Sequence, residues 1–265
     1  MSVLIVIPAR YASSRYPGKP LVPLTGPDGL SKPLIQRSWD AAMAVRGADR
    51  VVVATDDDRI AATVTGFGGE VVMTPASCEN GTARCAVAIA ELEETPEIVV
   101  NLQGDAPLTP PWFVEDLVTR LRAETEIEVA TPVLPCDGAA LAAFREDRRQ
   151  DRVGGTTAVF DRHWRALYFS KEVIPFTAET YEPTGLTPVW HHVGVYAYRP
   201  RALALYPTLK TGPLERLEGL EQLRFIENGH RILCVAVAGR GRKFWELNNP
   251  EDVVRVEAGL AEIDG

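Results

Sequence analysis

Sequence features that mark several common functional classes are missing from this chain of 265 residues. Its four cysteines, at positions 78, 85, 136 and 234, form no Cys-x-x-Cys pair, and its four histidines form no His-Glu-x-x-His motif. We therefore expect reduced cysteines and no zinc site. Lysine is also scarce, with five among 28 basic residues, so a lysine inside a motif is informative about function.

Long apolar runs and an excess of positive charge are missing too. The apolar runs are too short to span a bilayer, and the first residues carry neither the basic region nor the long apolar region of a signal peptide. The net charge is −8, which argues against a general nucleic-acid-binding protein. These absences predict a cytoplasmic protein that acts without membrane or nucleic acid.

The first half of the sequence alternates between segments typical of strands and of helices. Strands are predicted at 3–7, 51–55, 70–73, 98–102 and 128–133, and helices at 34–45, 59–64, 82–92 and 111–122. Short β-branched apolar runs separated by helices are typical of parallel strands buried on both faces. The pattern predicts an α/β fold of three layers with a mostly parallel, Rossmann-like sheet.

The second half interrupts this alternation between residues 137 and 188. The charged run from Arg145 to Arg152 is predicted to be a solvated loop, the alternative being a mobile lid over an anionic site. Further elements are predicted as a strand at 189–198, a long helix at 214–228, a strand at 231–238 and a helix at 250–262. We expect a single domain over 1–265, with an inserted arm or lid at about 137–200 that is β-rich and pairs two subunits.

The most informative segment is the end of the first strand and the loop after it, IVIPARYASSRYPGKPL (residues 5–21). The loop contains three cations and two serines, namely Arg10, Arg15, Lys19, Ser13 and Ser14. Ligands of α/β proteins bind outside the carboxyl ends of the strands, where backbone N–H groups and cations can converge on phosphates. This loop therefore predicts a polyphosphate site.

Two other kinds of phosphate-binding loop are excluded by their glycines. A Walker A loop requires Gly-x-x-x-x-Gly-Lys-Ser/Thr, but Gly18-Lys19 is followed by Pro20, and Ser13 stands where the first glycine belongs. A dinucleotide fingerprint requires Gly-x-Gly-x-x-Gly after the strand, and no such glycines are present. Asp56 is therefore not expected to bind the ribose of NAD, and a nicotinamide-dependent oxidoreductase has only the α/β alternation in its favour.

A single carboxylate, Asp105, follows the fourth predicted strand in the segment NLQGDAPL (residues 101–108). Gly104 turns the chain there, which places Asp105 at the carboxyl edge of the sheet beside the cationic loop. Mg²⁺ needs few protein ligands and keeps its waters, so one carboxylate can hold it against the phosphates of a nucleotide. Asp105 is the predicted magnesium ligand, and capping of the turn is its alternative role.

Two further motifs follow predicted strands or lie on them. In the segment NGTAR, Asn80 and Thr82 can cap the next helix, whose N–H groups could also bind a base or a phosphate, with Arg84 one turn inside. On a continuous strand, His192 and Tyr196 would share one face and could contact one ligand. A histidine packed in the core is the alternative for His192.

The predicted helix at 214–228 carries a polar stripe. Glu215, Glu218 and Gln222 recur at i, i+3 and i+7, which places them on one side of an otherwise apolar helix. The stripe is either a solvated face or a wall that binds hydroxyl groups.

These motifs, in this order, resemble those of the 3-deoxy-manno-octulosonate (Kdo) cytidylyltransferases, also called CMP-Kdo synthetases. The resemblance runs nearly end to end, and its most specific motifs are the cationic loop and the segment around Asp105. Shorter matches are VVVATDD (51–57), NGTAR (80–84), ALYFSKEVIP (166–175), HHVGVYAY (191–198), PLERLEGLEQLR (213–224) and NNPEDV (248–253). The resemblance implies a nucleotide-diphospho-sugar-transferase-like fold, a homodimer, and Mg²⁺-dependent transfer of CMP from CTP to an acidic sugar.

The resemblance also implies a role for each matched residue. The catalytic residues would be Arg15, Lys19 and Asp105. The nucleotide would be bound by Ala9, Arg10, Ser13, Thr55, Asp56, Asn80, Gly81 and Gln103. The acceptor would be bound by Arg84, His192, Tyr196, Glu215 and Gln222. Magnesium would be bound by Asp105, with Asn248 at the place of a second ligand.

The departures from the family pattern concern the acceptor. Ala83, Ala106 and Asn248 stand where the family has two glutamates and a second metal-binding aspartate, and a lysine expected near Thr157 is missing. Asn248 would bind Mg²⁺ only as a neutral ligand, more weakly by about an order of magnitude or more. A less negative pocket that keeps Arg84 and His192 fits an acceptor with more negative charge and fewer hydroxyls, such as that of the related phosphonoformate cytidylyltransferases.

The sequence thus predicts a cytidylyltransferase in which an acidic acceptor attacks the α-phosphorus of CTP in line and pyrophosphate leaves. Positioning and charge neutralisation supply most of the rate in such transfers, so a general base is not required. Lys19 and Arg15 would stabilise the departing pyrophosphate. The missing carboxylates allow an alternative from another class, a catalytically silent nucleotide-binding paralogue.

Overall fold

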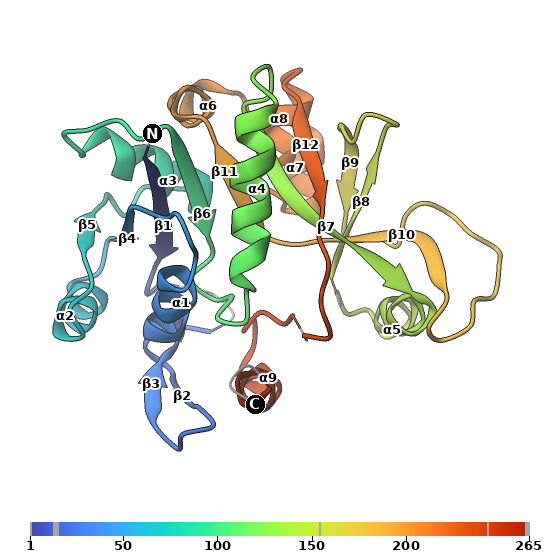
Figure 1. Cartoon of the computed structure of the whole chain (residues 1–265), viewed down its shortest axis with the longest axis horizontal. Coiled ribbons are helices and arrows are strands. Elements are labelled where there is room, and N and C mark those ends of the chain that lie inside the picture. Colours follow the sequence, from blue (N-terminus) through green and yellow to red (C-terminus); the bar gives the residue numbers. More distant parts are fainter. Residues whose placement is uncertain (1, 13–15, 154, 243, 263–265) are drawn as a thin grey trace.

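The fold is organised around one large mixed sheet (Figure 1). The computed structural model describes residues 2–12, 16–153, 155–242 and 244–262. The ten-stranded sheet has the order β5-β4-β1-β6-β11-β7-β10-β8-β9, and β12 pairs with β7 off this path. A separate antiparallel pair joins β2 and β3.

The elements alternate along the chain much as the sequence predicts. The strands are β1 (Val3–Ala9), β2 (Pro23–Thr25), β3 (Ser31–Pro33), β4 (Arg50–Thr55), β5 (Val71–Met73), β6 (Ile98–Leu102), β7 (Val129–Asp137), β8 (Thr156–Phe160), β9 (Ala166–Ser170), β10 (Leu186–His192), β11 (Val195–Tyr198) and β12 (Ile232–Ala236). The α-helices are α1 (Leu34–Met43), α2 (Asp58–Gly66), α3 (Gly81–Ala90), α4 (Pro111–Ala123), α5 (Gly138–Arg149), α6 (Pro200–Leu205), α7 (Pro213–Glu218), α8 (Leu223–Glu227) and α9 (Val253–Ala261). Short 3₁₀ turns lie at Lys19–Leu21, Tyr206–Thr208 and Pro250–Asp252.

Most strands of the large sheet run in one direction. β1 pairs in parallel with β4 and β6, and β4 pairs in parallel with β5. β11 is antiparallel to both β6 and β7, so β6 and β7 share a direction. The carboxyl ends of β1, β4 and β6 therefore lie at the same edge, and the cationic loop, Asp56 and Asp105 follow those ends.

Helices cover both faces of the sheet and complete three layers, as predicted (Figure 1). One face packs against α1, α2 and α4, and the other packs against α3, α6 and α8. In β6, Ile98 and Val100 belong to the first core and Val99 to the second. Burial on both faces explains the continuous apolar runs of these strands, because neither face needs polar residues.

The charged run at 145–152 lies mostly in a helix, so the prediction of a solvated loop is wrong. α5 begins after Asp137, whose side chain accepts a hydrogen bond from a backbone amide of the first turn. Leu141 and the partly buried Phe144 pack into a small core with Val189. The arginines occupy the rest of the helix surface. A run of charged residues can therefore form the solvated side of a helix as well as a loop.

Two predicted elements are each interrupted near a glycine. The strand expected at 189–198 is two strands, because β10 ends at His192 and β11 begins at Val195, with Gly194 between them. The helix expected at 214–228 is α7 and α8, because Gly219 adopts a left-handed conformation (φ 61°) and ends α7. A single polar stripe over this region is therefore not formed.

The chain between β12 and the last helix passes the carboxyl edge of the sheet. The backbone amide of Leu247 donates to the carbonyl of Asp105 (2.9 Å). Leu247 also packs in a third core with Leu24, Leu108 and Val256, which joins α9 to the β2–β3 pair. This segment brings Asn248 next to the end of β6.

Candidate functional site

The cationic loop and the lone carboxylate meet in the structure. Lys19 Nζ lies 2.5 Å from Asp105 Oδ2, and both side chains are partly buried. They come from segments 86 residues apart in sequence. The prediction that the cationic loop faces Asp105 is therefore confirmed, and this contact defines the centre of the candidate site.

The loop before Lys19 closes on itself. The backbone amide of Gly18 donates to the carbonyl of Tyr11 (2.9 Å), and the guanidinium of Arg59 stacks 3.3 Å above the Tyr11 ring. Arg10, at the start of this loop, is exposed to solvent. Ser13, Ser14 and Arg15 lie outside the described residues. In the described part of the loop, the cation Lys19 is held at the strand edge, and the second cation, Arg10, is exposed to solvent.

Glycine is required at position 104 for a steric reason. A Cβ atom on Gly104 would lie 2.9 Å from the carbonyl oxygen of Pro8, which is closer than side chains tolerate. The ends of β1 and β6 can therefore approach closely only without a side chain here. The same approach places Asp105 beside Lys19.

The first turn of α3 is capped, as the motif NGTAR allows. The Asn80 side chain accepts from the Ala83 amide (2.9 Å) and donates to the Tyr206 hydroxyl (2.8 Å). Glu221 accepts from the Thr82 amide (3.1 Å) and, at 3.4 Å, from the Gln103 side chain. A Cβ on Gly81 would contact the Gln103 amide, so Gly81 and Gln103 are neighbours. The predicted nucleotide residues Asn80, Gly81 and Gln103 therefore lie together.

Arg84 and Asp56 form an ion pair, although the sequence assigned them to different ligands. Arg84 is buried, with Nη1 donating to Thr74 Oγ1 (2.5 Å) and lying 3.3 Å from Asp56 Oδ1. The pair joins α3 to the end of β4, where Thr55 is buried and aligned with Ala9 of β1. Arg84 is thus engaged by the protein itself.

His192 and Tyr196 come close together, but His192 is not a cation. Their ring centroids are 5.6 Å apart, and the His192 ring bonds to the Thr131 hydroxyl (3.0 Å). Burial lowers the pKa of His192 to about 3, so the ring is neutral at physiological pH. Burial raises the pKa of Tyr196 well above its usual value, and Glu221 and Glu246 raise it further.

Glu215 and Gln222, the two residues of the polar stripe that were predicted to bind the acceptor, have different surroundings. Glu215 is buried, and both its carboxylate oxygens accept hydrogen bonds from Arg224 (2.7 and 2.8 Å). Both oxygens of Glu215 are thus engaged by the protein itself, and its role at an acceptor stays a prediction. Gln222 is buried, and its Nε2 has no hydrogen-bond partner within the described chain. Gln222 therefore keeps a donor for a ligand.

Glu221 is the site residue that the sequence analysis missed. It contacts the first turn of α3 and Gln103, and burial raises its pKa. The sequence analysis assumed one continuous helix. On such a helix Glu215, Glu218 and Gln222 share a face, and Glu221 does not. Gly219 carried the correct signal, because glycine is the usual residue where a helix ends.

Glu246 is a second acid that was missed. A Cβ on Gly194 would lie 3.0 Å from Glu246 Oε1, which places this carboxylate at the turn between β10 and β11. The sequence offered no sign of its place, because the segment around it contains no regular element. Glu221 and Glu246 are thus two carboxyl groups at this edge of the sheet that the sequence analysis did not count.

The donor set at Asp105 fits magnesium bound together with a nucleotide. Asp105 supplies one carboxylate, and Asn248 is brought near by the Leu247–Asp105 hydrogen bond. Across the described ranges, no three His, Cys, Asp or Glu residues gather into a metal-binding group. Mg²⁺ bound through one carboxylate plus phosphate oxygens and waters needs no such group.

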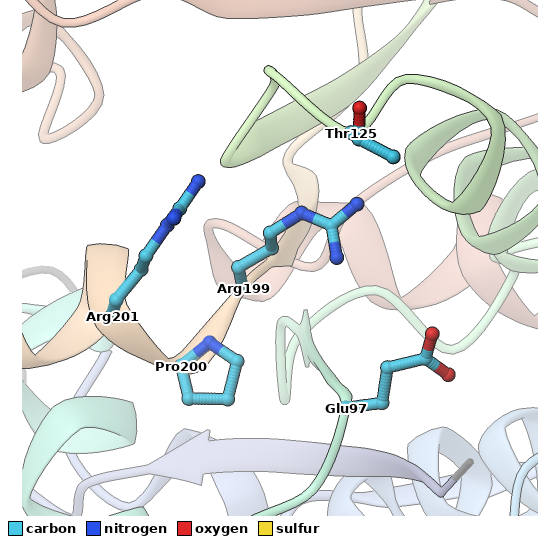
Figure 2. Close-up of a pocket in the computed structure, with 5 residues that line it drawn as sticks. All are labelled: Glu97, Thr125, Arg199, Pro200 and Arg201. Atoms are coloured by element: carbon cyan, nitrogen blue, oxygen red, sulfur yellow. The ribbon is translucent and has the colours of Figure 1, made fainter.

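A hollow of 320 Å³ lies at the opposite edge of the sheet (Figure 2). It is lined by Glu97, Thr125, Arg199, Pro200 and Arg201. Glu97 precedes β6, whereas Asp105 follows it, so the hollow is remote from the candidate site. Arg199 donates to the carbonyls of Ile127 and Leu121 and is already engaged.

Comparison with known proteins shows which family the chain belongs to. A family model described as "Cytidylyltransferase" matches residues 4–232. The chain belongs to the cytidylyltransferase family. It is 46% identical over 261 residues to a 3-deoxy-manno-octulosonate cytidylyltransferase of Maricaulis maris, with 98% of each chain covered. It is 41% identical over 263 residues to an 8-amino-3,8-dideoxy-manno-octulosonate cytidylyltransferase of a Shewanella species, with 98% of this chain and 99% of that one covered.

A solved structure shows the same fold in a liganded relative. This cytidylyltransferase superposes on a CMP:2-keto-3-deoxy-manno-octonic acid synthetase complexed with CTP, with a TM-score of 0.81 and 34% identity. The match covers 97% of this chain and 98% of that one. The chain is therefore an enzyme of the nucleotidyltransferase class. None of the helices in the described part of this cytidylyltransferase is long and apolar enough to cross a bilayer.

Proposed function

We propose that this cytidylyltransferase transfers CMP from CTP to a Kdo-type sugar acid and releases pyrophosphate. The Lys19–Asp105 contact is the observation that carries the proposal, because it sets a cation and a lone carboxylate side by side at the strand edge. The relatives with full-length matches act, by their names, on Kdo or its 8-amino analogue. The matched structure is a complex with CTP.

In this proposal the site positions two anionic substrates and neutralises their charge. Lys19, with Arg10 and Arg15, binds the triphosphate and stabilises the pyrophosphate as it leaves. Asn80, Gly81 and Gln103 line the nucleotide pocket, together with Ala9, Ser13, Thr55 and Asp56. Asp105 and Asn248 would hold Mg²⁺, which when bound supplies Lewis-acid polarisation of the α-phosphate.

The acceptor lies, in this proposal, between α3, β11 and α8. The Gln222 amide and the Tyr196 hydroxyl donate to its polar groups, and the Glu221 carboxyl accepts from its hydroxyls. Neutral His192 orients it by a hydrogen bond rather than by charge, since its pKa is about 3. A polyhydroxylated acid suits this mixture of donors and acceptors better than a compact dianion does.

Phosphonoformate therefore becomes the second candidate acceptor. Ala83, Ala106 and Asn248 favour it, because they leave the site less negative. Glu221 and Glu246 oppose it, because each adds a carboxyl group at the same site. Nothing in the described site supports a catalytically silent paralogue, since Lys19 and Asp105 are both in place.

A pyrophosphate-release assay tests these assignments together. CTP and Mg²⁺ are combined with Kdo, 8-amino-3,8-dideoxy-Kdo or phosphonoformate, with ATP in place of CTP as the nucleotide control. We expect release with CTP and a Kdo-type acid, and little with ATP. Efficient turnover of phosphonoformate without turnover of either sugar acid would reassign the acceptor. CTP binding without release from any acid would make the protein a silent paralogue.

We also propose that the segment from α5 to β10 pairs two copies of this chain. β9 is an edge strand of the sheet, and Phe176, Leu167 and Leu186 are 90%, 60% and 73% exposed. Exposed apolar side chains beside a sheet edge favour association with another chain. Light scattering should give twice the chain mass for the wild type and a smaller mass for Phe176→Ser combined with Leu186→Ser. A monomeric wild type would refute the pairing.

A further inference from the structure

Asn101 is the most unusual buried side chain in the described part of the protein. It is fully buried in β6, and neither its Oδ1 nor its Nδ2 has a hydrogen-bond partner there. Asn101 alternates with Val100 and Leu102, which face the α4 side, so it shares the opposite face with Val99 and Gln103. That face is covered by α3, and Gln103 at its end contacts the candidate site.

Folding alone gives no reason for an amide at this position. An asparagine side chain has two donors and two acceptor lone pairs, and leaving a buried polar group unpaired costs about 1–3 kcal/mol. The residues that flank Asn101 on this face, Val99 and Val6, are apolar and fully buried. Valine or leucine would fill the same space without that cost. The amide therefore needs a partner that is not part of the described chain.

Tyr196 is the residue opposite Asn101. The two are Cα partners in the antiparallel pair of β6 and β11, so their side chains are neighbours on the same face. Tyr198 bonds through its hydroxyl to Thr82, and Tyr206 bonds to Asn80. The Tyr196 hydroxyl, in contrast, forms no hydrogen bond within the described residues. The unpaired amide of Asn101 thus lies on the strand next to Tyr196, directly opposite it.

We propose that Asn101 is a positioning residue for the acceptor site, in that its amide fixes the Tyr196 hydroxyl through one internal water. Internal waters typically make about three hydrogen bonds to otherwise unpaired buried groups, and these two side chains supply that number. The inference rests on the proposed function, because it takes Tyr196 to be part of the acceptor site. Gly194, two residues before Tyr196, approaches Gln103 and Glu246, and the His192 ring lies 5.6 Å from the Tyr196 ring, which places Tyr196 at the candidate site.

Kinetics of three variants test this role. Asn101→Leu replaces the amide by an apolar group of the same branched shape, Asn101→Ser keeps a hydroxyl and space for water, and Tyr196→Phe removes the phenol oxygen. We expect Asn101→Leu to raise the acceptor KM about tenfold, equivalent to about 1.4 kcal/mol, with the CTP KM within about twofold of wild type. Asn101→Ser should recover part of the loss. Combining Asn101→Leu with Tyr196→Phe should add less than about twofold to the effect of Tyr196→Phe alone.

Val99→Ala is the matched control, because Val99 lies on the same strand and face and pairs with Tyr198 instead. It should lower the melting temperature through lost packing and leave both KM values unchanged. Asn101→Leu should melt no lower than wild type, since it removes an unpaired buried amide. An unchanged acceptor KM in both Asn101 variants, or losses that add fully to those of Tyr196→Phe, would overturn the proposal.

The same double-mutant cycle, measured by unfolding instead of kinetics, separates this inference from the proposed function. If the wild type transfers CMP to no acceptor, the proposed function fails. Denaturant unfolding of the ligand-free variants still reports whether Asn101 and Tyr196 are coupled. Coupling of the two substitutions supports the shared water, and strictly additive midpoint shifts refute it. Should Asn101→Leu fail to fold, Asn101→Ser takes its place in both cycles.

Discussion

At the scale of single residues, the Lys19–Asp105 ion pair would compete with ligand binding, because Lys19 and Asp105 are each proposed to bind a ligand. In the structure described here Lys19 neutralises Asp105, and both are only partly exposed. A triphosphate would offer Lys19 several oxygens and would free the carboxylate for Mg²⁺. Nucleotide and metal should therefore bind cooperatively, because each replaces one half of the existing ion pair.

Substitution of either member of this pair should abolish most activity without unfolding the protein. We expect Lys19→Ala and Asp105→Asn each to lower kcat by at least about 100-fold, the usual cost of losing one charge-stabilising group. Steady-state kinetics and a melting curve measure the two effects. Lys32→Ala is the control, since Lys32 also pairs with an aspartate, Asp40, at 2.6 Å. Near-normal turnover in Lys19→Ala or Asp105→Asn would exclude the role assigned to that residue.

The buried neutral histidine predicts a loss of stability in acid. The pKa of His192 is about 3 in the folded protein and about 6.5 when unfolded, so the unfolded chain binds more protons between these values. Its contribution to stability is therefore complete above pH 6.5 and declines as the pH falls. From pH 7 to pH 5 the decline should reach about 2 kcal/mol.

A variant isolates this contribution from that of other groups. In His192→Asn the free energy of unfolding should fall less between pH 7 and pH 5 than it does in wild type. Guanidinium unfolding at the two pH values measures the difference. Equal declines in both proteins would show that His192 titrates normally.

At the scale of elements, the break between α7 and α8 shapes the part of the candidate site that we propose binds the acceptor. Glu218 accepts hydrogen bonds from the Ser170 hydroxyl and the Lys171 amide, which fixes the end of α7 against β9. After Gly219 the chain turns, and Glu221 reaches the first turn of α3, with the buried Gln222 next to it in sequence. A continuous helix would have carried these two side chains elsewhere.

Gly219→Ala should therefore affect catalysis as well as stability. Alanine is strained in the left-handed conformation by about 1 kcal/mol, and its Cβ would lie 3.1 Å from Lys171 Nζ. We expect a modest loss of stability and an increase of several-fold in the acceptor KM. Gly229→Ala is matched to it, because Gly229 has φ 82° at the end of α8 and open space around it. The control should lose similar stability with an unchanged KM, and equal kinetics in both variants would contradict the role of the turn.

At the scale of the whole molecule, the sheet joins segments from the entire chain into one site. The segments after β1, β4 and β6 carry Lys19, Asp56 and Asp105. β11 carries Tyr196, the start of α8 carries Gln222, and the segment before α9 carries Asn248. A ligand that contacts so many segments stabilises all of them together. Ligand binding should therefore be visible in global unfolding.

CTP with Mg²⁺ should raise the melting temperature of the whole protein. At a concentration 100 times its Kd, the ligand adds about 2.7 kcal/mol of stability, which corresponds to a rise of about 5 °C or more. Differential scanning fluorimetry measures this rise, with NADPH at the same concentration as the control. A rise with NADPH and none with CTP would favour the oxidoreductase alternative, which otherwise lacks its glycine fingerprint.

How far the sequence predicts the site depends on how local each feature is. The cationic loop and Asp105 could be placed from sequence because both directly follow buried strands, and the carboxyl ends of parallel strands share an edge. The Arg84–Asp56 pair could not be foreseen in this way, because each residue alone fits a ligand-binding role. The charged residues of α5 were misassigned because a run of charges does not distinguish a loop from the solvated face of a helix.

The sequence by itself determined most of the strands and helices, where the cationic loop lies, and to which family the motifs are similar. Apolar periodicity and turn residues act over a few positions, so they can be interpreted without knowing the neighbours. Only the tertiary structure decided that Glu221 contacts the first turn of α3 while Glu215 pairs with Arg224, that His192 is neutral, and that Asn101 lies opposite Tyr196. These properties depend on burial and on contacts between segments distant along the chain, which local patterns do not encode.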